Sequence, residues 1–494
     1  MKSSTRLVAA AVAATLGSSA YALSPAAWTS TTTPITVFYT GGGSAEVQAV
    51  YVAVSKLLVT STIDVYTDGS GSTKHPQSLS YLIVSGTGSS SAGSLSGQPI
   101  GFIYKYNGGS FTNGVQPFVT GQTATLSYPT LASIATASGA PAGYSGSNPT
   151  SVNPDFVFTP TLTNTETPAW GISDEEPALF PYLWNANGAT VTPSGVKSVT
   201  AKPLYVAPFG IAVTANVYAQ KKKWSAAEIA AVYQGPTNGG FTAWNQLTGD
   251  NGSALTVAGP INIVDRGSGS GSKAAVNQFF FNYPLSTTSF SGVTPPYSVN
   301  GTQENNYTGT ILATSGAATN SFQDIKEASS VAVVDDLNNA QTAGLGAIGV
   351  LGLEFPPVFE QATSGTNSYD FVAINGTYPD SETGSDFINN PAAGGSTQYS
   401  NVINGQYLFA YQTSFNYKTA PSGFPSLVEN NLTAESISAA NVGAGFPTAT
   451  DGVLLDPATT GTTDPGNLTW TRTAQSNWSP VFFGPVSAAL ADPL

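Results

Sequence analysis

Two apolar runs in this sequence each pass through a glycine-rich turn directly into a segment with helical spacing. One runs from residues 35–39 through the glycines at 41–43, and the other from 261–264 through the turn at 267–272. Valine and isoleucine before each turn predict a buried strand, and the apolar stripe after it predicts a helix. Strands that alternate with helices build α/β folds. The sequence therefore predicts an α/β protein with two such units far apart in the chain.

The second turn carries residues that suit an anion. Arg266 is followed by three Gly-Ser pairs, and the helix is expected from about Ala275. Backbone N–H groups at a helix start, together with the helix dipole, attract negative charge. Ser270 and Ser272 add hydroxyl donors, and Arg266 adds a planar, permanent positive charge. A flexible surface turn explains the Gly-Ser run equally well from this stretch alone.

The first 22 residues have the pattern of a secretory signal peptide. Lys2 and Arg6 form the basic region, residues 7–16 form an apolar core, and Ala22 ends a small-residue cleavage site. The chain has no cysteine to carry a lipid anchor, and no later stretch has the roughly 18 apolar residues of a membrane span. We expect a periplasmic or secreted protein without a membrane span.

Charge and residue usage argue against nucleic-acid binding and catalysis. Charged residues make up 9% of the chain and the net charge is −13, whereas nucleic-acid binding needs a basic patch. His75 is the only histidine, which favours neither a histidine-rich metal site nor a general base. The neighbouring carboxylates Glu175 and Glu176 fit turn residues better than an acid–base pair. We expect no enzyme activity, no cofactor and no metal.

The rest of the chain shows further strand and helix signals. Ser225 and Glu228 have capping-box spacing and predict a helix start. Residues 139–167 are rich in Pro, Gly, Ser, Thr and Asn and are interpreted as an insertion or surface excursion. Buried strands are predicted at residues 100–106, 208–213, 331–334, 347–353 and 407–411.

Four short motifs, in this order, resemble one protein family. They are Thr-Gly-Gly-Gly-Ser-Ala at 40–45, Gly-Ile-Ser-Asp at 171–174, Pro-Phe-Gly-Ile-Ala-Val at 208–213, and the Arg266 turn. The chain resembles the phosphate-binding proteins of bacterial phosphate ABC transporters on these residues. The match extends over residues 35–62 and 171–283, and more loosely over 331–411.

The resemblance implies a two-lobed periplasmic binding-protein fold of type 2. Each lobe would be a mixed α/β sheet flanked by helices, and two hinge crossings, near residues 201–205 and 337–346, would join them. The implied division is a signal peptide at 1–22, lobe I at 23–203 plus 345–494 with an insertion at about 73–165, and lobe II at 204–344.

The resemblance also implies that inorganic phosphate binds between the lobes. The implied phosphate-binding residues are Ser44, Ala45, Ser110, Asp174, Arg266, Ser270, Gly271 and Ser272. Ser70 competes with Ser110 for one position. Asp174 would accept the proton of hydrogen phosphate, a proton that sulfate lacks, so the pair would discriminate between the two anions.

Two departures from the family pattern bear on this implied site. Ser268 stands where the family has an aspartate after the arginine, and Glu46 stands where it has an aromatic residue near the ligand. An ABC permease is a candidate partner of a monomeric binding protein. The alternative is a secreted structural protein of a matrix or adhesion type, in which the same fold has a weak or lost anion site.

Overall fold

The computed structural model describes residues 23–69, 80–140, 154–180, 185–186, 191, 193–235, 239–281, 323–327, 329–353, 355, 368–378, 401, 406–436 and 454–455. The predicted signal peptide, Ser70 and His75 lie outside these residues.

The first lobe is built on a mixed sheet with β1 (Thr36–Gly42) and β4 (Pro99–Lys105) at its centre. These two strands are parallel, and β1 is also parallel to β9 (Gly171–Ser173). The remaining strands in the order of the sheet are β17 (Ala410–Tyr417) beside β9, and then, beyond β4, β3 (Tyr81–Thr87), β2 (Asp64–Asp68), β7 (Phe156–Phe158) and β6 (Ser138–Gly139). We call this sheet and its helices lobe I.

Both faces of the lobe I sheet are covered. Phe102 and Tyr104 of β4 share a core with α1 (Val47–Ser55) and α10 (Phe424–Ser436). Ile103, between them, packs on the other face with Tyr66 and Tyr128. Successive strand residues point to opposite faces, and both sets are apolar because both faces are buried.

The second lobe is centred on β12 (Ala258–Arg266), which is parallel to β13 (Gln323–Glu327) and β14 (Leu345–Gly352). Helices α7 (Gly271–Phe281) and α8 (Ser330–Thr342) follow β12 and β13 and pack on the sheet, and α6 (Ala226–Gln234) packs against α7. We call this part of the sheet and its helices lobe II.

The shorter elements of the two lobes are α2 (Gly109–Gly114), α3 (Leu131–Ile134), α4 (Pro193–Val196), α5 (Ala215–Tyr218), β5 (Leu126–Pro129), β8 (Thr163–Glu166), β11 (Lys223–Trp224), β15 (Tyr369–Phe371), β16 (Ala373–Ile374) and β18 (Leu454–Leu455).

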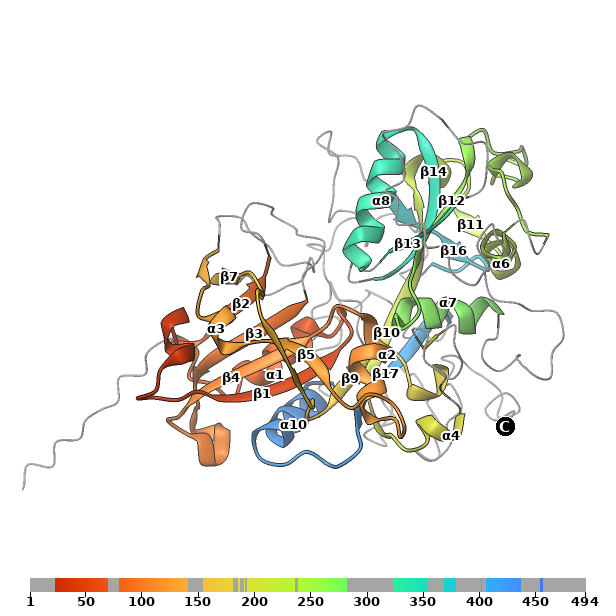
Figure 1. The fold of residues 1–494 in the computed structure, drawn as a ribbon. Helices are drawn as coiled ribbons and strands as arrows, with labels where there is room; N and C mark the ends of the chain where they lie inside the picture. The colour runs from red at the N-terminus through yellow and green to blue at the C-terminus, as the bar shows by residue number, and fades with distance from the viewer. Residues whose placement is uncertain are drawn as a thin grey trace, which may run out of the picture.

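One long strand joins the two lobes. Residues of β10 (Thr200–Thr214) pair with β17 in lobe I up to Pro208 and with β14 in lobe II from Phe209 onward. Figure 1 shows β10 running between the lobes, with α2 and α7 near the junction. The two lobes therefore form one mixed α/β sheet system flanked by helices, which confirms the α/β class and the flanking helices. The separate sheet expected in each lobe is instead continuous through β10. The first predicted crossing, 201–205, falls within β10.

The strand pairing moves the second crossing away from its predicted place. Residues 337–346 end α8 and enter β14, whose partners β12 and β10 put it in lobe II. Among the described residues, the chain next pairs with lobe I at β17, just after Phe409, whose carbonyl accepts the Phe209 N–H at 2.9 Å. A boundary at 345 does not fit this pairing, because β14 is a buried apolar strand and needs β12 beside it.

The segment predicted as an insertion, 73–165, supplies central strands. Within it, β4 pairs with β1 and β3 pairs with both β4 and β2. The Gly- and Ser-rich stretches around these strands carry the compositional signal of loops, but Ile100, Phe102 and Ile103 are fully buried. This part of the segment belongs to the lobe I sheet.

The strand predicted at 331–334 is a helix. Ser329 caps α8 by accepting the Ala332 N–H at 3.2 Å, and Val331, Val333 and Val334 are buried in the lobe II core. β-Branched residues favour strands, but tertiary packing and a serine cap override that preference here.

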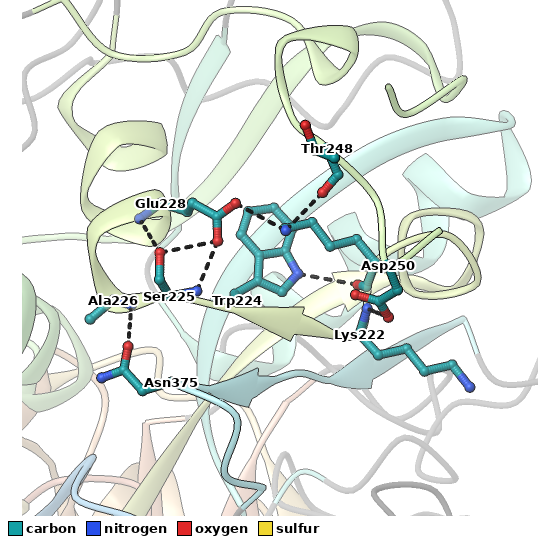
Figure 2. A network of polar contacts seen from close by, with 9 residues as sticks. Lys222, Trp224, Ser225, Ala226, Glu228, Thr248, Asp250 and Asn375 are labelled. Atoms are coloured by element: carbon teal, nitrogen blue, oxygen red, sulfur yellow. Dashed lines mark hydrogen bonds and ion pairs between the residues drawn. The ribbon is translucent and has the colours of Figure 1, made fainter. Parts of the chain in front are cut away.

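The predicted capping box at the start of α6 is present (Figure 2). Ser225 Oγ accepts the Glu228 N–H at 3.1 Å, and Glu228 Oε2 accepts the Ser225 N–H at 2.9 Å. Glu228 Oε1 also forms an ion pair with Lys221 Nζ at 3.0 Å, and the Lys221 ammonium donates to Thr248 O at 2.9 Å. The network ties α6 to the loop before β12.

Replacing Ser225 by alanine should destabilise lobe II locally. Loss of the cap is expected to lower the free energy of unfolding by about 1 kcal/mol, which a urea titration followed by circular dichroism would measure. An unchanged unfolding midpoint would show that the cap contributes nothing. Because Ser225 belongs to a network in which none of the predicted site residues takes part, this variant also serves below as a stability control.

Candidate functional site

The carboxyl ends of parallel strands meet at one edge of each lobe. In lobe I, Gly43 follows β1, Gly108 lies just beyond β4, and Asp174 follows β9. In lobe II, β12 leads through a turn into α7, and β13 leads into α8. Ligands of open α/β sheets bind at such edges, because loops and helix N-termini gather there.

The two edges touch at α2 and at the turn before α7. The Phe111 N–H of α2 donates to the carbonyl of Gly269 at 2.9 Å. Gly109 has φ of +91°, and a Cβ at this position would overlap the same carbonyl oxygen. Only glycine permits this backbone approach. Phe111, Phe180 and Ala274 share a buried apolar cluster beside it, so the lobes are packed together here.

Around this contact lies a group of polar and glycine residues that we call the interlobe cluster. Its members are Gly43, Glu46, Ser110, Asp174, Glu175 and Gly271.

Asp174 lies at the centre of the interlobe cluster. Its Oδ1 lies against Gly43 of lobe I and its Oδ2 against Gly271, the first residue of α7, so that a Cβ at either glycine would overlap the carboxylate. The Asp174 N–H donates to Ser110 Oγ at 3.4 Å. Asp174 is 7% exposed, and within the described residues its Oδ1 has no hydrogen-bond donor. Asp174, Ser110 and Gly271, three of the predicted residues, therefore come together.

Glu46 faces the same point from the start of α1. Glu46 is fully buried. A Cβ on Gly43 would lie 2.6 Å from Glu46 Oε2 and also 2.6 Å from Ser110 Oγ. Tyr104, whose hydroxyl donates to Gly43 O at 2.7 Å, is next to it. Burial raises the pKa of Tyr104 well above its ordinary value, and the Glu46 carboxylate raises it further. Glu46, which stands where the family has an aromatic residue, thus lies in the candidate site.

Glu175 adds a further buried carboxylate. Its Oε2 would lie 2.7 Å from a Cβ on Gly271, so it also touches the start of α7. It is fully buried, and neither carboxylate oxygen has a hydrogen-bond partner among the described residues. Burial raises the pKa of Glu175 well above its usual range, and the charge of Asp174 raises it further.

Arg266 ends β12, beside the turn that leads to α7. Its side chain is 7% exposed, and its Nη1 donates to Ser330 Oγ at the start of α8, at 2.6 Å. The preceding Asp265 pairs instead with Lys273 of α7, which agrees with the expected alternation along the strand. The positive charge of Lys273 is thereby balanced, and Arg266 brings a buried positive charge to this edge of lobe II.

The other predicted residues lie at helix starts. Ser44 and Ala45 precede α1, with Ala45 buried and Ser44 half-buried. Ser270 and Ser272 flank the first residue of α7, and both are buried. The choice between Ser110 and Ser70 stays a prediction, because Ser70 is outside the described residues.

Sequence reasoning did not single out Ser330 or the site position of Glu175. Ser330 directly precedes the segment that was predicted as a strand. Glu175 was interpreted as a turn residue. Each reaches the site through a contact with a distant part of the chain, and no local pattern marks such a contact.

Neither a metal site nor a membrane helix is found in the part of the chain that the structure describes. There, no three acidic or histidine side chains are grouped so as to hold a metal ion. No helix among the same residues has the length and apolar character to cross a bilayer.

Comparisons with known proteins find matches among solved structures. No protein-family model and no curated protein matches the chain. A candidate phosphate ABC transporter substrate-binding protein from Clostridium perfringens, solved with bound phosphate, is 12% identical over 58% of this chain and 79% of its own, with a TM-score of 0.32. An ABC-type phosphate transport receptor from Vibrio cholerae is 11% identical over 58% and 80%, with a TM-score of 0.28. PstS from Borrelia burgdorferi is 13% identical over 54% and 76%, with a TM-score of 0.28.

Proposed function

We propose that the chain is an exported solute-binding protein that holds inorganic phosphate between its lobes, at the interlobe cluster. The observation that carries the proposal is the position of Asp174. Its buried carboxylate lies against Gly43 of lobe I and the first residue of α7 in lobe II, and its Oδ1 has no donor within the described residues. Its backbone N–H donates to Ser110 Oγ of lobe I.

The chemistry of these groups favours a protonated oxyanion. A buried carboxylate oxygen without a donor is costly, and a ligand that brings an O–H removes that cost. Hydrogen phosphate brings one, and its other oxygens can accept from Arg266, from the hydroxyls of Ser110 and Ser270, and from the N–H groups at the start of α7. Sulfate at neutral pH has no proton to give to Asp174.

The motif resemblance supports the same ligand and suggests the setting. Proteins of the resembled family serve phosphate ABC transporters, and an ABC permease is therefore the candidate partner. The predicted signal peptide supports a location in the periplasm or outside the cell. A monomer that closes two lobes around its ligand suits this role, and no catalytic step is proposed.

Thermal unfolding tests the proposal. The midpoint should rise with millimolar phosphate and stay unchanged with equal sulfate. If the affinity is micromolar, a thousandfold excess of ligand adds about 4 kcal/mol to the stability of the native state. Ser225→Ala should start from a lower midpoint and show the same rise with phosphate. No response to phosphate would contradict phosphate binding, and an equal response to sulfate would contradict the selection of a protonated anion by Asp174.

A secreted structural role is the second candidate. The observation in its favour is the pair of additional buried carboxylates, Glu46 and Glu175, beside the expected anion position. A chain that has lost its ligand should not respond to phosphate at any pH and should associate with itself. Sedimentation velocity over a range of protein concentrations, with and without phosphate, separates the two roles.

A further inference from the structure

The interlobe cluster carries more negative charge than a phosphate dianion tolerates. Glu46, Asp174 and Glu175 come from two loops of lobe I, and each is more than nine-tenths buried. Like charges at short range in a poorly solvated site cannot all remain ionised. A dianion placed among them would add to the repulsion unless protons came with it.

The carboxylate oxygens also lack donors. Both oxygens of Glu175 and Oδ1 of Asp174 have no hydrogen-bond partner within the described residues. Buried polar atoms are nearly always satisfied, so unpartnered acceptors on two adjacent residues at the contact between the lobes indicate a ligand that donates. At least two O–H groups are needed to serve Asp174 and Glu175 together.

Among the described residues, burial and the charge of Asp174 both raise the pKa of Glu175, and no cation lowers it. Asp174 is its neighbour in the chain, and Gly271 meets it from α7. From β17, the Tyr411 hydroxyl donates to Ala275 O at 3.3 Å, and Ser414 Oγ donates to the Glu175 backbone carbonyl at 3.0 Å.

The charged groups around the rest of the cluster come, within the described residues, from α1 and from the lobe II edge. Glu46 faces Gly43 from the start of α1 beside the neutral Tyr104, and Ser110 of α2 has no charge. On the lobe II side, Lys273 is paired with Asp265, and Arg266 donates to Ser330. Lys326 of β13 also reaches the turn before α7, where it lies against Gly267. Two such cations cannot balance three carboxylates and a dianion.

We propose that phosphate binding at the interlobe cluster is coupled to proton uptake, so that the bound complex holds one proton more than hydrogen phosphate brings, with Glu175 as the residue that holds this second proton. This inference rests on the proposed function. Phosphate affinity then rises as the pH falls, and sulfate, which stays unprotonated, is not bound. The raised pKa of Glu175 agrees with a proton that is easily accommodated at this position.

Isothermal titration calorimetry with inorganic phosphate is the test. Titrations are run between about pH 5.5 and pH 7.5 in two buffers of different ionisation enthalpy, which reports the protons taken up. Each proton taken up on binding weakens the affinity about tenfold per unit rise in pH. The native chain should take up at least one proton at neutral pH.

Glu175→Gln is the decisive variant. Glutamine keeps the size of the side chain and can donate an N–H to phosphate, so this variant should take up about one proton fewer and should have a shallower pH dependence. Glu166→Gln, on the peripheral strand β8 and only partly buried, is the matched control and should behave like the native chain.

A second readout needs no ligand. A carboxyl whose pKa is raised by folding binds a proton more tightly in the native state than in the unfolded state. The free energy of unfolding therefore falls as the pH rises from the ordinary glutamate pKa of about 4.3 towards the folded value. Glu175→Gln should lack this part of the pH dependence, and Glu166→Gln should retain it.

The outcomes are distinct. Phosphate affinity that is flat or rises with pH, or a Glu175→Gln variant with the native proton uptake, would overturn the coupling but leave phosphate binding intact. No heat of binding at any pH would overturn the proposed function itself.

Discussion

Arg266→Ala should bind phosphate at least about a hundredfold more weakly than the native chain. The guanidinium is buried at the end of β12, and charge-assisted hydrogen bonds of this kind contribute about 1.5–3 kcal/mol each. The neighbouring Lys273 cannot replace it, because Lys273 is paired with Asp265. Isothermal titration calorimetry at a pH where the native chain binds well measures the loss.

Arg266→Lys separates charge from geometry. Lysine keeps the positive charge but lacks the planar fork, so its affinity should lie between those of the native chain and the alanine variant. Circular dichroism and the ligand-free unfolding midpoint establish that each variant is folded. An alanine variant that is folded and binds phosphate normally would remove Arg266 from the site.

Gly109→Ala should weaken phosphate binding by at least about tenfold through the contact between the lobes. Gly109 has φ of +91°, which costs a residue with a Cβ about 1–2 kcal/mol. The added Cβ would also overlap the Gly269 carbonyl of lobe II and break the hydrogen bond from the Phe111 N–H. Lobe closure would then be incomplete, and small-angle X-ray scattering should show a larger radius of gyration in the presence of phosphate.

Gly121→Ala is the matched control for this substitution. Gly121 has φ of +86°, but a Cβ there would meet nothing within 4 Å. The two variants share the backbone cost and differ only in the interlobe overlap. Equal phosphate affinities in the two variants would show that the approach of α2 to Gly269 has no part in binding.

The local patterns of the sequence predicted much of the fold. Both strand, glycine turn and helix units are present, at β1 with α1 and at β12 with α7, because apolar periodicity and glycine turns act over a few residues. The capping box at Ser225 is also local and was predicted correctly. The errors occur where distant contacts decide: 331–334 became helical under packing and a serine cap, and β14 belongs to lobe II because of its partner strand.

The same distinction between local patterns and distant contacts holds for the residues of the candidate site. Asp174, Ser110 and Gly271 were predicted from motifs, and the structure brings them together. Glu175 and Ser330 were not predicted, since each matters through a contact between segments far apart in sequence. Glu46 was expected near the ligand because it stands where the family has an aromatic residue. Its carboxylate is buried against Gly43 and therefore lies within the candidate site.

Equilibrium dialysis with radiolabelled phosphate tests the central claim most directly. The native chain and Arg266→Ala are dialysed against micromolar phosphate at mildly acidic and neutral pH, with excess unlabelled sulfate as competitor. The account predicts one phosphate retained per native chain, more tightly at the acidic pH, undisturbed by sulfate, and little or none retained by the arginine variant. A native chain that retains no phosphate at either pH would contradict it.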